Sequence, residues 1–140
     1  MNLTYEILSE SNRTILDDIH NDENVKKFLH VSDEYYNYLL CDNNAVYKLV
    51  KLNSNYVGGL HFEVHHDYAT FSIEVLTDYQ RQGIAYRIID DLKNNYFNLN
   101  IKYYVVFIED NNMKSRLLFE KSDFRFVRYE NELRKYVYEV

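Results

Sequence analysis

The chain has only three glycines in 140 residues, Gly58, Gly59 and Gly83, and no proline. An average domain carries about 7% glycine, so each of these three should occupy a position that a side chain would disturb. Gly83 stands in TDYQRQGIAYRII, between the β-rich run ATFSIEVL and a helical pattern that reaches DDLKNN. The sequence therefore predicts a tight turn from a strand into a helix at Gly83.

The hydrophobic pattern predicts a mixed α/β fold (α+β with a mixed sheet) in a single domain over residues 1–140. The expected order is β-α-α-β-β-β-α-β-α-β-β. Its elements are a strand at 3–8, helices between Thr14 and Cys41 with a cap for the second at Ser32, strands at 45–52, 56–64 and 68–76, a helix after Gly83, a strand at 101–108, a helix over 111–122 capped by Asn111 or Asn112, and a hairpin around Asn131.

Two of these segments should contribute most to the core. Ala85, Ile88, Ile89, Leu92 and Tyr96 recur at spacings of three and four, which places them on one face of a helix. The run IKYYVVFI is short, β-branched and aromatic, which predicts a largely buried strand.

Composition narrows the class of protein. The chain is 46% apolar without a long uncharged apolar run, and its first residues lack a basic and apolar leader, so we expect neither a membrane span nor a signal peptide. The single cysteine, Cys41, fits a reducing cytoplasm and a small core position. A net charge of -6 without blocks of like charge makes a nucleic-acid partner an unfavourable interpretation.

The histidines allow two interpretations. His61, His65 and His66 would be metal ligands in the first, but they stand in one strand and turn without a second cluster to complete a ligand set. We expect them on the surface of the strand and expect no metal.

The turn at Gly83 is suited to an anion. The first amides of a helix are unpaired, and together with the helix dipole they attract phosphate. Gly83 and Ala85 leave the backbone accessible, and Arg81 adds a cation. The chain lacks the GxxxxGK[ST] pattern of loops that bind nucleoside triphosphates and the GxGxxG pattern of loops that bind dinucleotides, so both kinds of loop are excluded. An ordinary helix start stays open as the alternative.

The segment VLTDYQRQGIAYRIIDDL, followed by NNMKSRLLFEKSDF, resembles the GNAT superfamily of N-acetyltransferases over roughly residues 44–127. Gln80, Gly83 and Ala85 match the Gln/Arg-x-x-Gly-x-Gly/Ala pattern of its pyrophosphate loop. The second match is to Asn-x-x-Ala-x-x-Leu-Tyr-Glu-Lys-x-Gly-Phe, where Asn112, Ser115, Leu118, Glu120, Lys121 and Phe124 fall at corresponding positions.

The resemblance implies that acetyl-CoA is the co-substrate. In the family, the strand before the loop carries a bulge and splays from its neighbour, and its exposed backbone pairs with the pantetheine arm. A side chain at Gly83 would then occupy phosphate space. The implied cofactor-binding residues are Ile73, Glu74, Val75, Gln80, Arg81, Gln82, Gly83, Ile84, Ala85, Asn112, Ser115 and Phe119.

The family's catalytic residues are missing at their expected positions. The tyrosine that protonates the thiolate is replaced by Phe119, and the positions of the usual bases hold Phe107, Ala69 or Phe71. Asp123 replaces a glycine, so we expect the turn after that helix to be made differently. Positioning, with water carrying protons, still permits transfer. The weak candidates for catalysis are Glu63, Glu74 and Tyr103, and for each of them a role as a strand-surface or core residue is the favoured explanation.

The acceptor site implied by the resemblance is bordered by the N-terminal helices, and residues 1–50 hold nine acidic against four basic residues. Asp33 and Glu34 with Tyr35, Tyr36 and Tyr38 would form an acidic, aromatic rim for a cationic amine. A solvated helix with a stripe of tyrosines is the alternative.

The function that follows is a cytoplasmic N-acetyltransferase acting on a primary amine: a protein lysine or N-terminus, a polyamine or another small cationic amine. A degenerate GNAT-fold module that binds CoA without transfer remains the alternative, as does transfer of another acyl group. Monomer and homodimer are both open.

Overall fold

The computed structural model describes residues 1–27, 35, 38, 39, 41 and 44–140. The predicted order of elements is confirmed over these residues. The helix expected after Ser32 falls largely outside them. The bounds are β1 Leu3–Ile7, a 3-10 turn Glu10–Asn12, α1 Arg13–Asn21, α2 Glu23–Lys26, β2 Ala45–Leu52, β3 Asn55–Val64, β4 Tyr68–Val75, a 3-10 turn Thr77–Tyr79, α4 Ile84–Lys93, β5 Tyr103–Glu109, α5 Met113–Lys121, β6 Arg125–Glu130 and β7 Leu133–Glu139.

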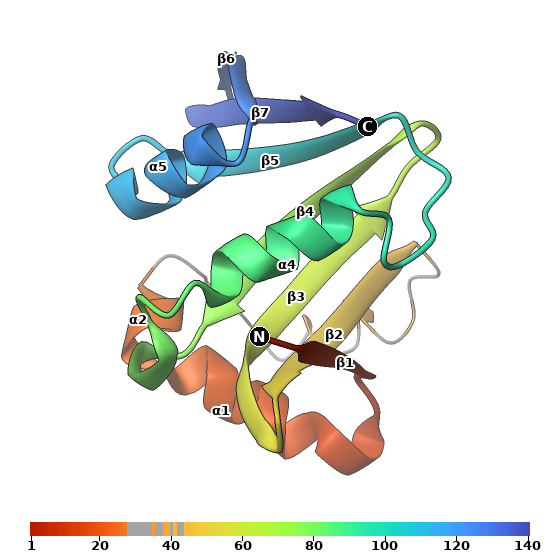
Figure 1. Cartoon of the computed structure of the whole chain (residues 1–140), viewed down its shortest axis with the longest axis vertical. Coiled ribbons are helices and arrows are strands. Elements are labelled where there is room, and N and C mark those ends of the chain that lie inside the picture. Colours follow the sequence, from red (N-terminus) through yellow and green to blue (C-terminus); the bar gives the residue numbers. More distant parts are fainter. Residues whose placement is uncertain (28–34, 36–37, 40, 42–43) are drawn as a thin grey trace.

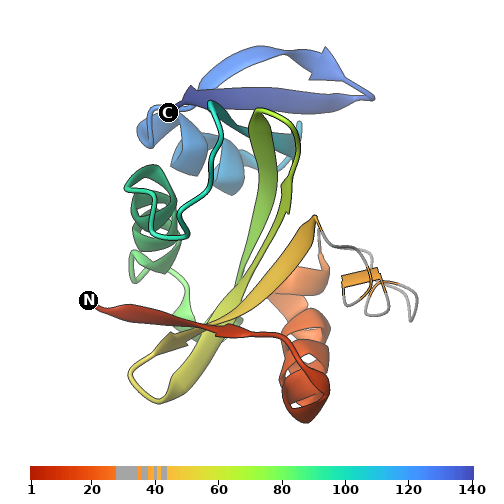
Figure 2. The same cartoon turned by 90° about the vertical axis from the view of Figure 1, so that its right-hand side faces the viewer.

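Seven strands form one sheet in the order β1-β2-β3-β4-β5-β7-β6 (Figure 1). Neighbouring strands are antiparallel, except β4 and β5, which run parallel and are connected through α4. α4 lies on one face of the sheet, and α1 lies on the opposite face (Figure 2). The mixed α/β fold predicted from the sequence is thus confirmed.

The parallel pair β4–β5 is short. The register joins Tyr68–Thr70 of β4 to Tyr103–Val105 of β5 and extends no further within the described chain. β4 continues to Val75 and β5 to Glu109, and the two strands diverge (Figure 1). The prediction of a bulge in β4 is wrong, because β4 keeps a continuous register with β3. The sheet opens only because β5 diverges from β4.

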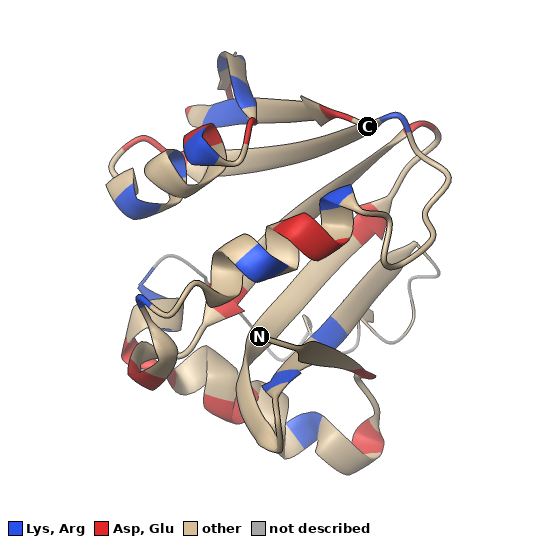
Figure 3. Ribbon diagram, viewed as in Figure 1, with Lys and Arg blue, Asp and Glu red and all other residues tan. Residues whose placement is uncertain are grey.

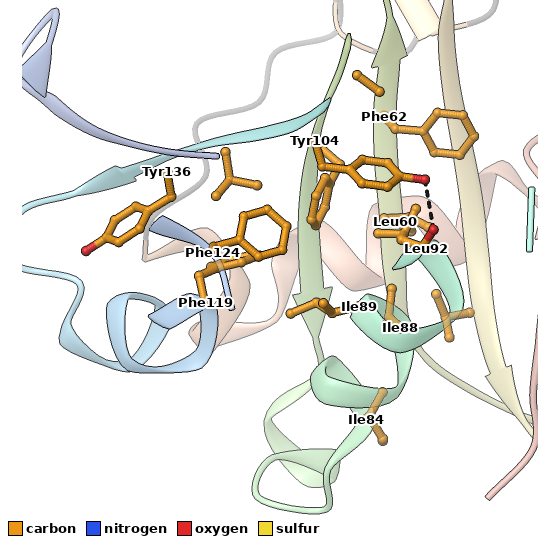
Figure 4. Packing of buried hydrophobic residues seen from close by; sticks show 14 of the residues in the cluster. Leu60, Phe62, Ile84, Ile88, Ile89, Leu92, Tyr104, Phe119, Phe124 and Tyr136 are labelled. Atoms are coloured by element: carbon orange, nitrogen blue, oxygen red, sulfur yellow. Dashed lines mark hydrogen bonds between the residues drawn. The ribbon is translucent and has the colours of Figure 1, made fainter. Parts of the chain in front are cut away.

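The face of the sheet under α4 carries the larger hydrophobic cluster. Alternation along β3 places Leu60 and Phe62 on this face, where they pack with Ile88, Ile89 and Leu92 of α4 (Figure 4). These three α4 side chains are at most 1% exposed. Burying an aliphatic side chain of this size contributes about 1.5–3 kcal/mol, so this cluster fixes α4 on the sheet.

The end of α4 differs from its prediction. The helix ends at Lys93, and the Tyr104 hydroxyl donates to the Leu92 carbonyl at 3.0 Å (Figure 4). Tyr96 was expected on the buried helical face, but it follows the helix, is 55% exposed and packs its ring against Tyr5. The spacing rule fails here because the residue is no longer helical.

A second cluster fills the face under α1. Leu16 and Ile19 of α1 pack with Tyr47 and Leu49 of β2. Cys41, expected in the core, is exposed instead, whereas Leu39 is buried in this cluster.

The C-terminal third follows its prediction closely. The run IKYYVVFI becomes β5, in which Tyr104, Val105, Val106 and Ile108 are buried. The hairpin around Asn131 joins β6 and β7.

In the described part of the chain, no helix combines the length and the apolar character required to cross a bilayer.

The turn after α5 is made without glycine. Asp123 has φ of 71°, the left-handed conformation that a glycine usually supplies at this place. The expectation of a different turn is therefore wrong: aspartate adopts the conformation itself, and the Lys93 ammonium lies 3.1 Å from its carboxylate.

Gly58 is required by the close approach of β3 to β4. A Cβ on Gly58 would collide with the backbone carbonyl of Glu74. We expect Gly58→Ala to lower the free energy of unfolding by about 1–3 kcal/mol in denaturant titration. Gly83→Ala is the control: its Cβ would meet no described protein atom within 4 Å, so only its φ of 79° should cost stability, about 1 kcal/mol. Wild-type stability of Gly58→Ala would contradict this packing.

Candidate active site

A cavity of about 730 Å³ opens where β4 and β5 diverge. Small-molecule sites commonly measure about 300–1,000 Å³, so its size suits a ligand. β4, β5, α5, α2 and the loop into α4 contribute to its lining. The cofactor-binding residues expected from the sequence that line it are Ile73, Glu74, Val75, Gln80, Arg81, Gly83, Ile84, Ala85, Asn112, Ser115 and Phe119.

Gln82 is the exception among the expected residues. It is exposed and does not line the cavity, and its side-chain amide donates to the Asp78 carbonyl at 3.4 Å. The loop turns between Arg81 and Gly83, which directs the intervening side chain outward.

Several lining residues were missed by the sequence reasoning. They include Asn24, Val25 and Lys27 at α2 and Val106, Ile108 and Glu109 of β5. Their place in the site follows from which strands pair and where they part, and no local motif marks it.

The loop before α4 contains two residues in the left-handed conformation. Arg81 has φ of 63° and Gly83 has φ of 79°. Turns of this kind direct successive backbone N–H groups into one concavity that suits an anion. Gly83 has no side chain to cap α4, so the first amides of the helix remain available. The left-handed backbone at position 83 is thus a second reason for glycine, in addition to the space for a phosphate that was expected from the sequence.

The loop is held at both sides of the cavity. The side-chain amide of Gln80 donates to the Val75 carbonyl at 2.6 Å, and its oxygen accepts from the Lys114 ammonium at 2.9 Å. Gln80 therefore joins the end of β4 to the start of α5. The positive charge of Lys114 also lies on the cavity wall, which favours an anionic ligand.

Asn112 is the cap of α5. Its side-chain oxygen accepts from the Ser115 amide at 3.3 Å, which fits one of the two caps predicted from the sequence. The cap fixes the start of α5 against the cavity, so Asn112 and Ser115 face it from a rigid position.

The cavity near β5 is apolar where proton donors were expected. Phe119 is 5% exposed and packs against Phe71 and Phe124, and Phe107 lies on the wall of β5. None of these side chains can give or take a proton.

The candidates for catalysis differ in position. Tyr103 does not line the cavity, because it lies at the end of β5 that still pairs with β4. Glu63 on β3 does not line it either. Glu74 lines it and is 6% exposed.

Glu74 belongs to a buried polar cluster on the α1 side of the sheet. The Tyr47 hydroxyl donates to its Oε2 at 3.1 Å, and His20 Nε2 lies 3.6 Å from its Oε1. Burial, reinforced by the charge of Glu74, raises the pKa of Tyr47 and of Tyr35, so both phenols remain protonated. Burial lowers the pKa of His61, which favours a neutral imidazole at pH 7.

The three histidines considered as ligands separate in the structure. His61 packs in this cluster against Tyr35 and Tyr47, which corrects its expected place on the strand surface. His65 and His66 are exposed in the turn after β3. Among the residues that the structure describes, no group of three potential ligands is placed to hold a metal ion.

The expected acceptor rim is described only in part. Tyr35 and Tyr38 lie near the His61 ring, whereas Asp33, Glu34 and Tyr36 lie outside the described residues. Charged residues of both signs are interspersed over the ribbon (Figure 3).

An opened β4–β5 pair beside an anion-binding turn is the arrangement of an acyl-CoA-dependent transferase fold. The model of the acetyltransferase (GNAT) family matches residues 8–124, and the chain therefore belongs to the GNAT family of acetyltransferases. It is an acyltransferase of this acetyl-CoA-dependent class. A search of curated proteins finds no match.

Solved structures share the fold across nearly the whole chain. The GNAT domain of S. lividans PAT superposes with a TM-score of 0.81 at 10% identity, covering 97% of this chain and 89% of that one. A domain from Methanocaldococcus jannaschii gives 0.81 at 17%, covering 99% of both. Spermidine N-acetyltransferase from Vibrio cholerae, in complex with CoA and spermine, gives 0.80 at 20%, covering 98% and 95%.

Asp22 connects α2 to the loop that leads into the cavity. Its carboxylate accepts from the Asn24 and Val25 amides, at 2.9 and 3.4 Å, and from the Thr77 amide and hydroxyl, at 3.0 and 2.8 Å. Desolvation alone would raise the pKa of Asp22, but these hydrogen bonds outweigh it and lower the pKa.

We expect Asp22→Ala to lower the free energy of unfolding at pH 7 by about 1 kcal/mol, the usual value of a helix cap. Because the folded-state pKa is depressed, this contribution is present above the unfolded pKa of about 3.9 and is lost as pH falls through the folded value. Urea titrations of both proteins at pH 7 and pH 2.5 measure the difference. An equal difference at both pH values would refute a role for the carboxylate charge.

Proposed function

We propose that this chain, acting as one domain over residues 1–140, transfers an acetyl group from acetyl-CoA to a primary amine by direct attack. The observation that carries the proposal is the junction of two features: β4 loses β5 as a partner after Thr70, and the same strand leads into the turn at Gly83. A ligand with an extended arm that ends in a pyrophosphate requires both features. The open strand edge can pair with the arm, and the turn can bind the pyrophosphate.

The residues present fit acetyl-CoA. The edge of β4 over Ile73–Val75 has no strand partner on the β5 side in the described chain, so its backbone groups are available to the pantetheine arm. The amides of Arg81–Ala85 would hold the pyrophosphate, with Arg81 and Lys114 as cations nearby. Asn112 borders the same cavity and would contact the pantetheine arm.

The chemistry requires an unprotonated amine beside the thioester. The amine nitrogen forms a bond to the carbonyl carbon, the carbon–sulfur bond breaks, and the thiol leaves without a covalent enzyme intermediate. Positioning of the two reactants accounts for much of the acceleration in such a reaction.

A small cationic amine is the acceptor class that we favour, with a protein lysine or N-terminus in the same class. The acidic excess of residues 1–50 supports a cationic partner. One structural neighbour was solved with CoA and spermine, and this gives a suitable first probe.

A catalytically degenerate CoA-binding module is the second candidate. Phe119, which cannot protonate a leaving thiolate, favours it. The two candidates share acetyl-CoA binding and differ in turnover.

Binding is tested by calorimetric titration with acetyl-CoA and CoA. We expect micromolar affinity for both, and a loss of at least about 100-fold in Gly83→Glu, because the new carboxylate would oppose the pyrophosphate. Gln82→Glu is the matched control: it adds the same charge one residue away, on a side chain outside the cavity, and should weaken binding far less. Unchanged affinity in Gly83→Glu would refute the loop assignment.

Turnover is tested by free-thiol release with spermine, spermidine, an aminoglycoside and a lysine peptide. We expect acetylation of at least one amine above the rate in buffer, with the product confirmed by mass spectrometry. If acetyl-CoA binds and every amine gives the buffer rate, the binding module is the correct function.

A further inference from the structure

Three buried polar atoms meet on the α1 side of β4 without a hydrogen-bond partner among the described residues. They are Nε2 of His20, Nε2 of His61 and Oε1 of Glu74, contributed by α1, β3 and β4. His20 and Glu74 are 8% and 6% exposed. Leaving such a group unpaired costs about 1–3 kcal/mol, so three together indicate a place that exchanges protons or binds a polar group.

The surroundings of Glu74 hold its carboxylate in one position. The Tyr47 hydroxyl donates to Oε2 at 3.1 Å, so Oε1 is the free oxygen. Gly59 on β3 makes this contact possible, because a Cβ there would collide with the Tyr47 hydroxyl and approach Glu74 Oε2 to 2.9 Å. The absence of a side chain at Gly59 is thus explained by the Tyr47–Glu74 pair.

Glu74 also lies where the reaction would take place. It lines the cavity on the strand that we assign to the pantetheine arm, and its side chain points to the side of α1, opposite α4. Phe107 and Phe119, on the β5 and α5 walls, carry no exchangeable proton. Of the three candidates from the sequence, only Glu74 lines the cavity.

We propose that Glu74 accepts the proton that the acceptor ammonium loses, and that His20 is the positioning residue that receives this proton from Glu74. The inference rests on the proposed acetyl transfer. An N–H bond of the ammonium breaks and its proton moves to Glu74 Oε1, directly or through one water molecule. The neutral amine attacks the thioester, and its second proton goes to the departing thiolate. His20 takes up the first proton at Nε2, 3.6 Å from Oε1, and its ring releases a proton from Nδ1.

The titratable groups around Glu74 agree with this role. His20 faces it from α1, Tyr47 from β2 and His61 from β3, and Tyr35 packs over the two imidazoles. The phenols remain protonated, as described above, so they are hydrogen-bond donors and do not compete for the proton. Glu74 contacts Tyr47 and His20 directly, and its charge also acts on Tyr35 and His61.

The test is the pH dependence of spermine acetylation at saturating acetyl-CoA, from pH 6 to pH 10, for wild type and Glu74→Gln. We expect kcat at pH 7 to fall about 10²–10⁴-fold in the variant, because proton transfer by a positioned group contributes that much. The loss should shrink as pH rises, because free amine then forms in solution. Acetyl-CoA affinity from calorimetry should stay within about twofold, which a general structural defect would not allow.

Glu139→Gln is the matched control, since it makes the same change on an exposed residue of β7 outside the cavity, and it should keep the wild-type profile. Should Glu74→Gln fail to bind acetyl-CoA, Tyr47→Phe decides: losing the donor to Oε2 should move the acidic limb of kcat to higher pH. A wild-type rate and profile in Glu74→Gln, or an unmoved limb in Tyr47→Phe, overturns the inference alone. If the wild-type protein binds acetyl-CoA but acetylates neither spermine nor the other amines, both the proposed function and the inference about Glu74 are overturned.

Discussion

The divergence of β5 from β4 is the constraint on which the rest of the structure depends. β5 pairs with β7 along its full length, from Tyr103 opposite Glu139 to Glu109 opposite Leu133, whereas it pairs with β4 over only three residues. β4 in turn remains paired with β3 up to Val75. The single sheet thus has two halves that are joined only at one end of β4 and β5. Since backbone N–H and C=O groups require partners when buried, the open edge of β4 is suited to an extended ligand.

The fold also fixes the direction of the loop amides before any ligand arrives. Ile84, Ile88 and Ile89 are buried under α4, so the helix cannot rotate without losing core contacts. Two hydrogen bonds hold the preceding loop, one between Gln80 and Lys114 and one between Thr77 and Asp22. Donors that are already oriented cost little to organise when an anion binds, and this preorganisation adds affinity.

Sequence patterns predicted local elements well because their causes are local. Alternation marked β2 and β3, the turn at Gly83 was placed to the residue, and the cap of α5 was narrowed to Asn111 or Asn112. The divergence of β4 and β5 was expected only through the family resemblance, and the lining by α2 was missed. Both depend on strand pairing at a distance, which neither hydrophobic period nor turn chemistry encodes. Tyr96 failed because a face of a helix has no meaning beyond the end of that helix, whereas Cys41 was placed in the core from its residue type alone.

The Glu74 cluster contains residues that lower the stability of the sheet. Glu74 is buried on β4 between the half-buried Ile73 and Val75, where an apolar residue would pack without unpaired atoms. A buried carboxylate near two imidazoles is a poor source of stability, because desolvation offsets much of its attraction to them. Gly59 adds to the cost, since glycine in a strand interior weakens the strand. These costs are understandable if the carboxylate is needed beside the site of acetyl transfer, because packing explains Gly59 through the Tyr47–Glu74 pair but gives no reason for a buried carboxylate at position 74.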